Sequence, residues 1–184
     1  GDSNSLPALT RAGIAHLYFV SIHPFEDGNG RVGRAVAEKV LAQSLGRPTL
    51  IALAHTIEAN RKDYYAALER NNQLLDITDW LIWFSQTILN AQNYTVQCVE
   101  FLINKTKFYT RLDGLLNDRQ HRVLARMFKE GLSGFKGGLS ADNYMRITKT
   151  SASTATRDLQ DLVAKSALTR TGELKATRYY LKLA

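Results

Sequence analysis

The chain has 184 residues, of which 45% are hydrophobic, and carries a formal net charge of +7. This length suits one domain or two small ones. No apolar run approaches the roughly 20 residues that cross a bilayer, and no signal peptide is visible, so we expect a cytoplasmic protein without membrane contact. The single cysteine, Cys98, excludes an internal disulfide and falls in an apolar series, which favours a buried structural thiol.

Two helices are predicted around a polar, glycine-rich segment in the first quarter of the chain. The first helix covers residues 9–21 and delivers the chain to His23. The second covers residues 31–45, where apolar residues recur at helical spacing, and it stops at Gly46. Between them, residues 23–34 read HPFEDGNGRVGR. The polar segment therefore leads directly into the N-terminus of a helix.

This segment predicts a phosphate-binding loop. Gly28, Asn29 and Gly30 tolerate unusual backbone angles, so successive amide N–H groups can point into one concavity and bind an anion. The dipole of the following helix also favours negative charge there. Arg31 and Arg34 share a helix face and can grip adjacent phosphoryl groups. Taken alone, Gly-Asn-Gly is usually only a turn, so the prediction depends on the joint pattern.

Two further side chains give the loop its chemistry. Asp27 is a hard oxygen ligand placed to hold Mg²⁺ against phosphate oxygens. His23 is the side chain of this segment that can act as a general base near neutral pH, although a lone His before Pro is more often a loop or core residue. A base, a metal ligand, an anion-binding nest and two cations together indicate phosphoryl or nucleotidyl transfer to a hydroxyl group.

Residues 23–34 resemble the active-site signature of the Fic family, His-x-Phe-x-Asp/Glu-Gly-Asn-Gly-Arg-x-x-Arg, at every specified position. The resemblance implies a Fic-type helical bundle that transfers AMP from ATP to a Tyr, Thr or Ser hydroxyl of a target protein. It implies that His23 deprotonates that hydroxyl, that Phe25 anchors the loop in the core, and that Asp27 holds Mg²⁺ on the α and β phosphates. It also implies a set of nucleotide-binding residues, with the last on the γ phosphate: Asp27, Gly28, Asn29, Gly30, Arg31, Val32, Gly33 and Arg34.

One position separates two branches of this family. The related Doc branch, which acts as a kinase, carries Lys at the position of Gly30, so the glycine here favours nucleotidyl transfer. A second resemblance lies in a predicted helix over residues 61–72 and implies that three residues wall the adenine: Tyr64, Tyr65 and Asn72. Tyr rings offer stacking faces and the amide can pair with a base edge, but both tyrosines also fit an ordinary core-packing face.

Two features expected from the Fic resemblance are absent from the sequence. Fic domains usually extend upstream and carry a β-hairpin flap, yet only 22 residues precede His23, so we expect an N-terminally incomplete catalytic core. The pattern Ser/Thr-x-x-x-Glu-Gly/Asn, by which an inhibitory helix presents Glu to Arg34, does not occur in the chain. We therefore expect weak activity from this fragment alone, and regulation from upstream or from another chain.

A long helix is predicted from a cap at Thr78 or Asp79 to about residue 109, with apolar residues three and four apart. At 1.5 Å per residue it spans about 45 Å, which outruns a compact domain and predicts a boundary near residue 113. Charge supports this division, because residues 1–115 hold 11 Lys and Arg against 11 Asp and Glu, whereas residues 116–184 hold 13 against 6. The sequence thus predicts two domains: a catalytic core, 1–113, and a second domain, 114–184.

The second domain is predicted to contain three helices and a hairpin. The first helix ends at Gly131, the second lies within residues 140–147 and the third covers residues 153–164. A hairpin from residue 167 to residue 181 follows them. This order resembles a winged helix, a small α+β domain, and the third helix resembles the recognition helices of bacterial winged-helix regulators. The resemblance places possible DNA contacts near the N-terminus of that helix, at Thr154, Thr156 and Arg157.

Two acids in the same helix argue against strong DNA binding. Asp158 and Asp161 are expected to flank the reading surface and repel phosphate, which favours a protein-docking or packing module. The fold class is therefore mainly α, a Fic-type helical bundle followed by a small α+β winged-helix domain. Two functions stay open: a protein adenylyltransferase that uses ATP and Mg²⁺, and a DNA-binding transcription regulator whose Fic-like domain senses a nucleotide. The complete motif favours the first, because a sensor would not need His23.

Overall fold

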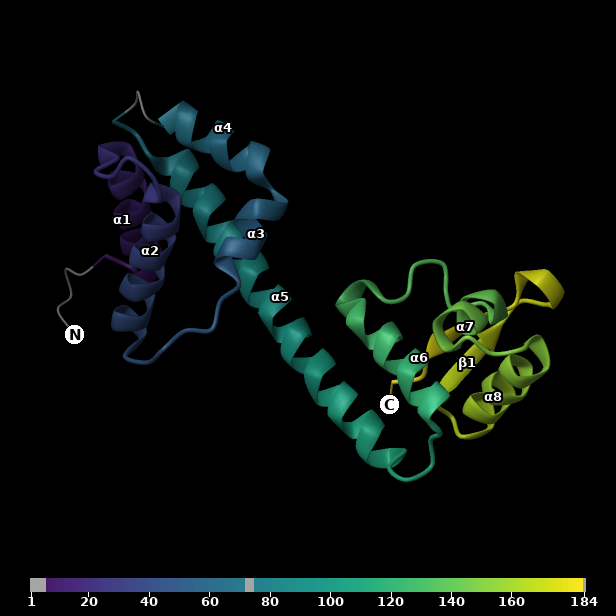
Figure 1. Ribbon diagram of the computed structural model, residues 1–184. Coiled ribbons are helices and arrows are strands. Elements are labelled where there is room, and N and C mark those ends of the chain that lie inside the picture. The colour runs from purple at the N-terminus through teal and green to yellow at the C-terminus, as the bar shows by residue number, and fades with distance from the viewer. Residues whose placement is uncertain (1–5, 72–74, 184) are drawn as a thin grey trace. The chain divides into compact units, whose positions relative to one another are not determined.

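The computed structural model describes residues 6–71 and 75–183. It divides into two compact units, which we call unit 1, over residues 1–96, and unit 2, over residues 97–184. Both units are built mainly from helices (Figure 1), which confirms the mainly helical prediction. Within the described part of the chain, no helix is both long and apolar enough to span a bilayer.

The described part of unit 1 consists of four helices and the first part of a fifth: α1 (Ala8–Ile22), α2 (Asn29–Leu45), α3 (Leu53–Ala59), α4 (Arg61–Asn71) and α5 (Thr78–Arg111). Helices α1 and α2 lie side by side (Figure 1), and both were predicted. Helix α2 ends as predicted at Gly46, whose φ of 65° suits a residue without a Cβ. Helix α3 was not predicted, because its seven residues are too few to establish a helical period.

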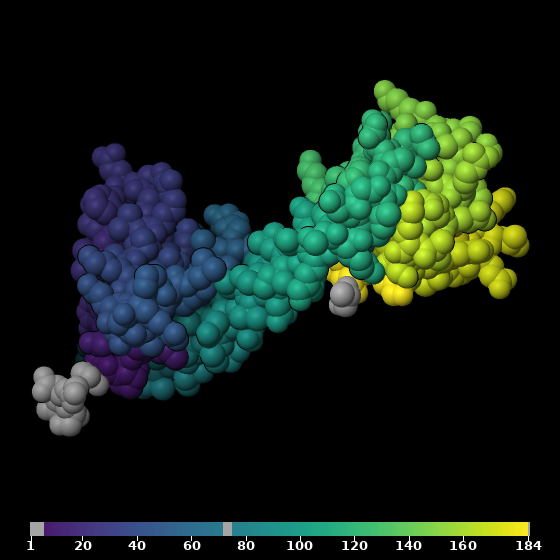
Figure 2. Space-filling model, turned by 90° about the horizontal axis from the view of Figure 1, so that it is seen from below, coloured from purple at the N-terminus to yellow at the C-terminus, as the bar shows by residue number. Residues whose placement is uncertain are grey.

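The core of unit 1 ties α5 to α1. The indole N–H of Trp80 donates a 2.8 Å hydrogen bond to the carbonyl of Gly13, and both Trp80 and Phe84 are fully buried. A Cβ on Gly13 would lie 2.9 Å from Leu81 of α5, so the two helices approach each other closely there. In the space-filling view, the purple and blue segments of unit 1 pack without visible gaps (Figure 2). This packing fixes the positions of α1 and α2, between which the predicted phosphate-binding loop lies.

The division between the units falls within α5 rather than near residue 113. The last turn of α5 places Phe108, and the residue after the helix, Leu112, in the core of unit 2, whereas the first turns of α5 belong to the core of unit 1. The predicted boundary followed the end of the amphipathic pattern, but this helix supplies apolar side chains to both cores. Cys98, midway along α5, is a free thiol that is only partly buried, so its expected burial is wrong.

Unit 2 contains the end of α5 and, in chain order, α6 (Asp118–Lys129), η1 (Gly131–Ser133), α7 (Ala141–Thr148), α8 (Ala152–Ala164), β1 (Leu168–Thr171), η2 (Leu174–Ala176) and β2 (Arg178–Leu181). The strands are antiparallel, with Leu168 opposite Leu181, and Leu139 forms a further bridge to Tyr179. The predicted order of three helices and a hairpin is confirmed. Each of the three helices begins at a side chain that accepts a backbone N–H, namely Asn117, Ser140 and Ser151.

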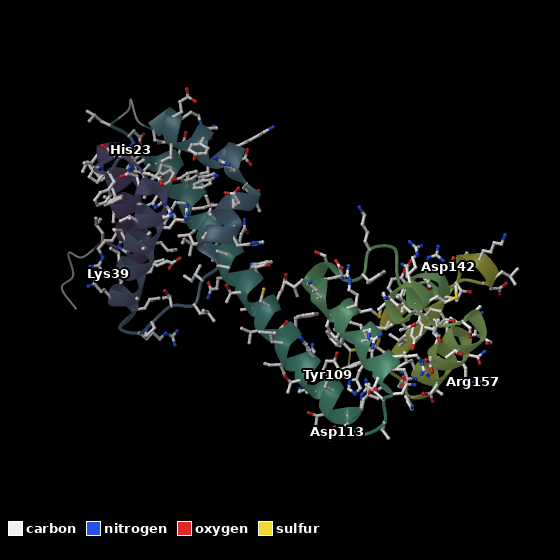
Figure 3. All side chains as sticks on the ribbon, in the orientation of Figure 1. His23, Lys39, Tyr109, Asp113, Asp142 and Arg157 are labelled. Atoms are coloured by element: carbon white, nitrogen blue, oxygen red, sulfur yellow. The ribbon has the colours of Figure 1, made fainter. Side chains whose placement is uncertain are left out.

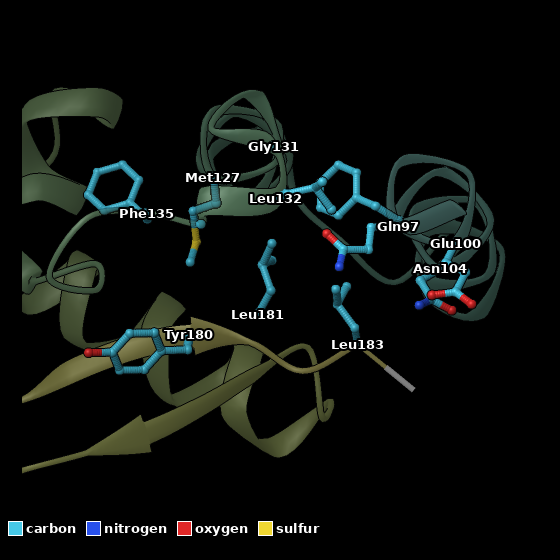
Figure 4. Close-up of a pocket in the computed structure, with 12 residues that line it drawn as sticks. Gln97, Glu100, Asn104, Met127, Gly131, Leu132, Phe135, Tyr180, Leu181 and Leu183 are labelled. Atoms are coloured by element: carbon cyan, nitrogen blue, oxygen red, sulfur yellow. The ribbon is translucent and has the colours of Figure 1, made fainter. Parts of the chain in front are cut away.

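A groove of about 440 Å³ opens in unit 2 between α5, the end of α6 and β2. Figure 4 shows apolar side chains, among them Met127, Phe135 and Leu181, facing this space, while Gln97 and Glu100 lie at its edge on α5. None of the three predicted DNA contacts lines the groove. It is therefore a feature of the packing of unit 2, separate from the predicted recognition surface.

A buried carboxylate joins the helices of unit 2. Asp158 of α8 is 5% exposed and accepts hydrogen bonds from Arg119 at 2.7 Å, from the Tyr144 hydroxyl at 2.9 Å and from the Asn117 amide at 3.2 Å. Burial by itself raises the pKa of Asp158, but these hydrogen bonds outweigh it and hold the pKa below its usual value. Asp158 therefore stays charged at neutral pH and links α6, α7 and α8.

The expectation that Asp158 and Asp161 flank an outward surface is wrong for Asp158, which is buried, whereas the side chain of Asp161 is 42% exposed. Asp158 shares its helix face with buried Leu159 and Leu162, and Asp161 accepts a 2.7 Å hydrogen bond from Gln120 of α6. Arg157 is exposed on α8 (Figure 3). Consecutive helix residues differ by about 100° in direction, so neighbours in sequence can face opposite sides. Asp158 therefore faces away from the exposed side of α8, and Asp161 is paired with Gln120 and Lys165.

We expect Asp158→Asn to lower the free energy of unfolding of unit 2 by about 1–2 kcal/mol, because a neutral amide is a weaker acceptor than the carboxylate for the hydrogen bonds from Tyr144 and Arg119. Urea unfolding followed by hydrogen exchange of unit 2 amides measures this change. The control Glu173→Gln removes an exposed carboxylate in the same unit and should change stability by less than about 0.5 kcal/mol. Since the folded pKa of Asp158 is depressed, its stabilisation is present above pH of about 4 and is lost at lower pH. Equal effects of the two substitutions would contradict this account.

Candidate active site

A cavity of about 560 Å³ in unit 1 gathers most of the residues predicted to bind a nucleotide. The motif segment contributes six of them, together with the predicted base His23: Asp27, Gly28, Asn29, Gly30, Arg31 and Arg34. Helix α4 contributes Tyr64 and Tyr65 from the opposite side of the cavity. Figure 3 shows His23 at one end of the α1 and α2 pair, with Lys39 farther along α2. The structure thus brings the predicted base, the loop and the two tyrosines to one place.

The chain turns at His23, whose backbone is in the left-handed conformation. His23 follows the last residue of α1 with φ of 50°, and its N–H bonds the carbonyl of Phe19 at 3.2 Å. A positive φ is uncommon for a residue with a Cβ, and His is among the residues that adopt it more readily. The turn ends α1 and leads the chain toward the start of α2, so His23 and the loop line the same cavity.

The predicted anion-binding nest is the first turn of α2. Gly28 precedes the helix with φ of 89°, a conformation that favours glycine. The N–H of Val32 bonds the carbonyl of Gly28 at 3.0 Å. The amides of Asn29, Gly30 and Arg31 therefore belong to the first turn, whose N–H groups have no partner inside a helix. An anion at this position would meet both these donors and the positive end of the helix dipole.

Asn29 closes the loop by binding its backbone. Its Oδ1 accepts the N–H of Phe25 at 3.0 Å, and its Nδ2 donates to the carbonyl of Phe25. The Phe25 ring is 52% exposed and lies 6.2 Å from the ring of Phe19. The expectation that the Phe25 side chain anchors the loop in the core is therefore wrong. The anchor is the buried amide of Asn29, which holds the backbone of Phe25.

Asp27 and Arg31 pair across the mouth of the loop. The Arg31 guanidinium lies 3.0 Å from the Asp27 carboxylate, and the two side chains are 72% and 91% exposed. An ion pair this exposed contributes little to stability, so both groups are available to a ligand. Mg²⁺ in phosphate sites takes one or two carboxylates and completes its shell with phosphate oxygens and water. Asp27 offers one such carboxylate, and the described residues hold no cluster of three His, Cys, Asp or Glu side chains that could hold a metal ion.

Arg34 carries its charge beside the cavity. A Cβ on Gly30 would lie 3.5 Å from Arg34 Nη1, so the guanidinium lies across the glycine. Burial raises the pKa of Tyr64 to about 12, and the charge of Arg34 opposes this shift. Burial also lowers the pKa of His16 to about 4, and Arg34 adds to the lowering. His16 and Tyr64 are therefore neutral at pH 7, whereas the carboxyl of Glu38, four residues further along α2, also interacts with the charge of Arg34.

Two of the motif residues predicted to bind the nucleotide, Val32 and Gly33, do not line the cavity. Val32 is 36% exposed on the surface of α2. Gly33 is buried against α1, where a Cβ would lie 2.9 Å from Val20 and 3.3 Å from Cε1 of His16. The structure therefore gives Gly33 a packing role in place of the predicted contact with a nucleotide, because the helix turns this position toward α1 and Arg34 toward the cavity.

The two tyrosines of α4 have different surroundings. Tyr64 is 3% exposed and its hydroxyl lies 3.1 Å from Nε2 of His16, so it belongs to the core as well as to the cavity wall. Tyr65 is 54% exposed, and the guanidinium of Arg61 lies 5.7 Å from the centre of its ring. Asn72 lies outside the described residues. Tyr65 is thus the tyrosine with an exposed ring for a ligand to stack on.

Three charged residues of the cavity were not predicted, namely Glu26, Glu58 and Arg61. The last two form an exposed ion pair, with 3.9 Å between the guanidinium and the carboxylate. Glu26 occupies a variable position of the motif, and Glu58 lies on the unpredicted helix α3. Only a prediction of α3 and of its approach to the loop would have placed Glu58 here.

The predicted DNA contacts lie in the first half of α8. Thr156 and Arg157 are exposed, whereas Thr154 is partly buried and its hydroxyl lies 3.1 Å from that of Ser151. A second cavity of about 560 Å³ in unit 2 is lined by Thr156 together with basic residues of the hairpin region: Arg170, Lys175 and Arg178. Asp142 of α7 also lines it. The outer face of α8 and these cations thus share one concave surface.

Comparison with known proteins supports the interpretation of unit 1. Residues 2–41, which include the loop and most of α1 and α2, match the sequence model of the Fic/DOC family. The chain is 38% identical over 68 residues to the protein adenylyltransferase fic-1 of Caenorhabditis elegans, covering 37% of this chain and 12% of that protein. It is 37% identical over 72 residues to the protein adenylyltransferase Fic of Drosophila mojavensis, covering 39% of this chain and 13% of that protein.

A solved structure of a Fic family protein from Desulfovibrio desulfuricans G20 matches 98% of this chain and 50% of its own, at 22% identity and a TM-score of 0.47. The match to the two adenylyltransferases named above covers only about an eighth of the length of each. What these comparisons establish is a Fic/DOC match over residues 2–41, which contains the loop and its flanking helices.

We expect Asn29→Ala to weaken the binding of a nucleoside triphosphate about tenfold, because the amides of the first turn are no longer held in place. Isothermal titration calorimetry with ATP measures this change. The control Asn93→Ala, on an exposed position of α5, should leave the affinity unchanged. Unchanged affinity of Asn29→Ala would show that the loop keeps its shape without this amide.

Proposed function

We propose that the protein transfers AMP from ATP to a hydroxyl group of a target protein. The observation that carries the proposal is the meeting of His23, the first turn of α2 and Arg34 in one cavity. The activity named for the matched relatives, protein adenylyltransferase, supports it. The substrate class is therefore a protein that presents an accessible Tyr, Thr or Ser side chain to this cavity.

In this reaction His23 takes the proton of the target hydroxyl while the hydroxyl oxygen attacks the α-phosphorus of ATP. A bond forms between that oxygen and the α-phosphorus, and the bond to the oxygen that bridges to the β phosphate breaks. Pyrophosphate leaves with the electron pair. The first-turn N–H groups of α2 and Arg31 stabilise the charge on the phosphates, and Arg34 holds the γ phosphate. Mg²⁺ bound by Asp27 would neutralise charge on the α and β phosphates.

Gly30 supports transfer of AMP over transfer of a phosphoryl group. A side chain at this position would begin 3.5 Å from Arg34 Nη1 and would occupy space beside the phosphates. Without one, the triphosphate can lie against the backbone of the first turn, with its γ end at Arg34. This orientation leaves the α-phosphorus as the atom that faces His23.

We expect His23→Ala to lower transfer of label from α-labelled ATP to protein by about 10² or more, with the affinity for ATP nearly unchanged, because the phosphate-binding loop stays intact. Incubation of the chain with α-labelled ATP, Mg²⁺ and cell lysate measures transfer. The control His55→Ala removes an exposed histidine of α3 and should retain full transfer.

Two results would count against the proposal. Labelling that is equal in His23→Ala and in the unchanged chain would remove His23 from the mechanism. Label that reaches protein from γ-labelled ATP and not from α-labelled ATP would make the protein a kinase.

We also propose that unit 2 is a winged helix that binds duplex DNA as a second function. The order of α6, α7, α8 and the β1 and β2 hairpin, with the bridge from Leu139 to Tyr179, supports this fold. The observation that favours DNA is the direction of the two acids of α8, since Asp158 and Asp161 bond to groups on α6. The outer face of α8 then offers Thr156 and Arg157 to a phosphate backbone or a base edge.

We expect the full chain to bind duplex DNA with an affinity that falls steeply with salt, with a log–log slope of about −3.5 if about four phosphates are contacted. Arg157→Ala should weaken binding about tenfold, whereas Lys39→Ala, which removes an equal charge from unit 1, should not. A gel-shift titration at several salt concentrations measures both. Binding that is absent at low salt, or equally reduced by both substitutions, would leave unit 2 as a protein-docking module.

A further inference from the structure

One buried polar contact joins the two sides of the candidate active site. His16 of α1 is fully buried, Tyr64 of α4 is 3% exposed, and Nε2 of His16 lies 3.1 Å from the Tyr64 hydroxyl. The two residues are 48 positions apart in sequence. Neither the Fic motif nor the proposed reaction assigns a task to His16.

The His16 ring is wedged against the helix that carries the phosphate-binding loop. Its plane is stacked on the indole of Trp80, with ring centres 5.6 Å apart and 9° between the planes. On another side it contacts the backbone of α2, since a Cβ on Gly33 would lie 3.3 Å from its Cε1. The ring is therefore held between α2 and α5 and has little freedom to move away from either.

The hydrogen bond to Tyr64 is the side-chain hydrogen bond of this ring. Nδ1 of His16 is buried without a hydrogen-bond partner among the described residues, and the Gly33 backbone beside the ring raises the pKa of His16 without outweighing the effect of burial. Both groups are neutral at pH 7, because burial lowers the pKa of His16 and raises that of Tyr64. Loss of either partner would leave a buried polar atom unpaired, which is strongly unfavourable.

Tyr64 connects His16 to the wall of the cavity. Its ring lines the cavity and lies 5.2 Å from the ring of Tyr65, the exposed tyrosine one residue further along α4. The chain of contacts therefore runs from Gly33 on α2, through His16 and Tyr64, to Tyr65. It connects the helix that binds phosphate with the helix that faces the rest of a nucleotide.

We propose that the buried hydrogen bond between His16 and Tyr64 positions α4 against α2, so that one nucleotide contacts both helices at once. The proposal rests on the proposed function in that it takes ATP as the ligand of this cavity. His16 is a positioning residue, because it reaches the ligand only through Tyr64. The phosphate side of the site is formed by α2 itself, and it does not depend on this hydrogen bond.

The binding of ATP and the binding of inorganic triphosphate depend on this hydrogen bond to different extents. ATP needs the correct distance between α2 and α4, whereas inorganic triphosphate needs only the first turn of α2 and the two arginines. Removing the hydrogen bond should therefore weaken the binding of ATP and spare that of triphosphate. A general loosening of the fold would weaken both ligands alike.

The test uses Tyr64→Phe, which removes one oxygen atom and keeps the ring. Tyr18→Phe, on an exposed tyrosine of α1, is the matched control. We also include His16→Leu, which removes both ring nitrogens, and His16→Gln, whose side-chain amide can reach the position of Nε2 and bond to Tyr64. Melting curves identify a temperature at which every variant is folded.

Calorimetric titration of the full chain with ATP and with inorganic triphosphate, both with Mg²⁺, gives the result. We expect Tyr64→Phe and His16→Leu to raise the Kd for ATP about five- to tenfold and to change the Kd for triphosphate by less than about twofold. His16→Gln should recover part of the affinity for ATP. Tyr18→Phe should match the unchanged chain for both ligands.

Several outcomes would overturn the inference. If the Tyr64→Phe variant binds ATP as tightly as the wild-type chain, or if its affinities for ATP and triphosphate fall equally, the positioning role is excluded. The proposed function is not affected by either result. If the wild-type chain binds neither ligand, both proposals are contradicted, and this result is obtained before any variant is compared. An unchanged chain that binds ATP no more tightly than triphosphate shows that α4 contributes nothing to binding, which also overturns the inference.

Discussion

The close approach of α2 to α1 at Gly33 is the constraint on which the rest of unit 1 depends. A side chain at Gly33 would collide with Val20, so the two helices can pair at this distance only with a glycine there. Their pairing brings the end of α1 next to the start of α2, and a short loop is then enough to join them. Asn29 closes that loop on the backbone of Phe25. The relation between His23 and the anion-binding turn is therefore set by helix packing, which is stiffer than a loop.

In each unit a buried titratable side chain joins helices, and it is neutral in unit 1 but charged in unit 2. His16 in unit 1 is buried as a neutral ring, and protonation would place an unpaired charge among aromatic rings. Asp158 in unit 2 is buried as an anion whose charge is balanced by Arg119 and by two neutral donors. Because a buried polar group must find its partners, it also fixes which face of its helix points inward. For α8, this determines that Arg157 lies outside.

The sequence predicted those features that depend on neighbours within one or two helical turns. The bounds of α1, α2 and α5, the cap at Gly46 and the order of elements in unit 2 all follow from apolar spacing, glycine and capping side chains. The roles of Phe25, Gly33 and Asp158 could not be predicted in this way, because each is decided by a contact with another element. The bond between His16 and Tyr64 is the extreme case, since no local pattern marks two residues 48 positions apart as partners.

In the proposed function, the exposed ion pair of Asp27 and Arg31 would offer one group to a metal ion and the other to a phosphate. The pair is too exposed to contribute much to the free energy of folding. Both groups therefore lie at the cavity mouth and can exchange each other for a ligand. A magnesium nucleotide in the proposed function would give Asp27 a stronger partner in the metal and Arg31 a stronger partner in the phosphate. In that function each ligand would release the side chain that the other needs, so metal and nucleotide would favour one another's binding.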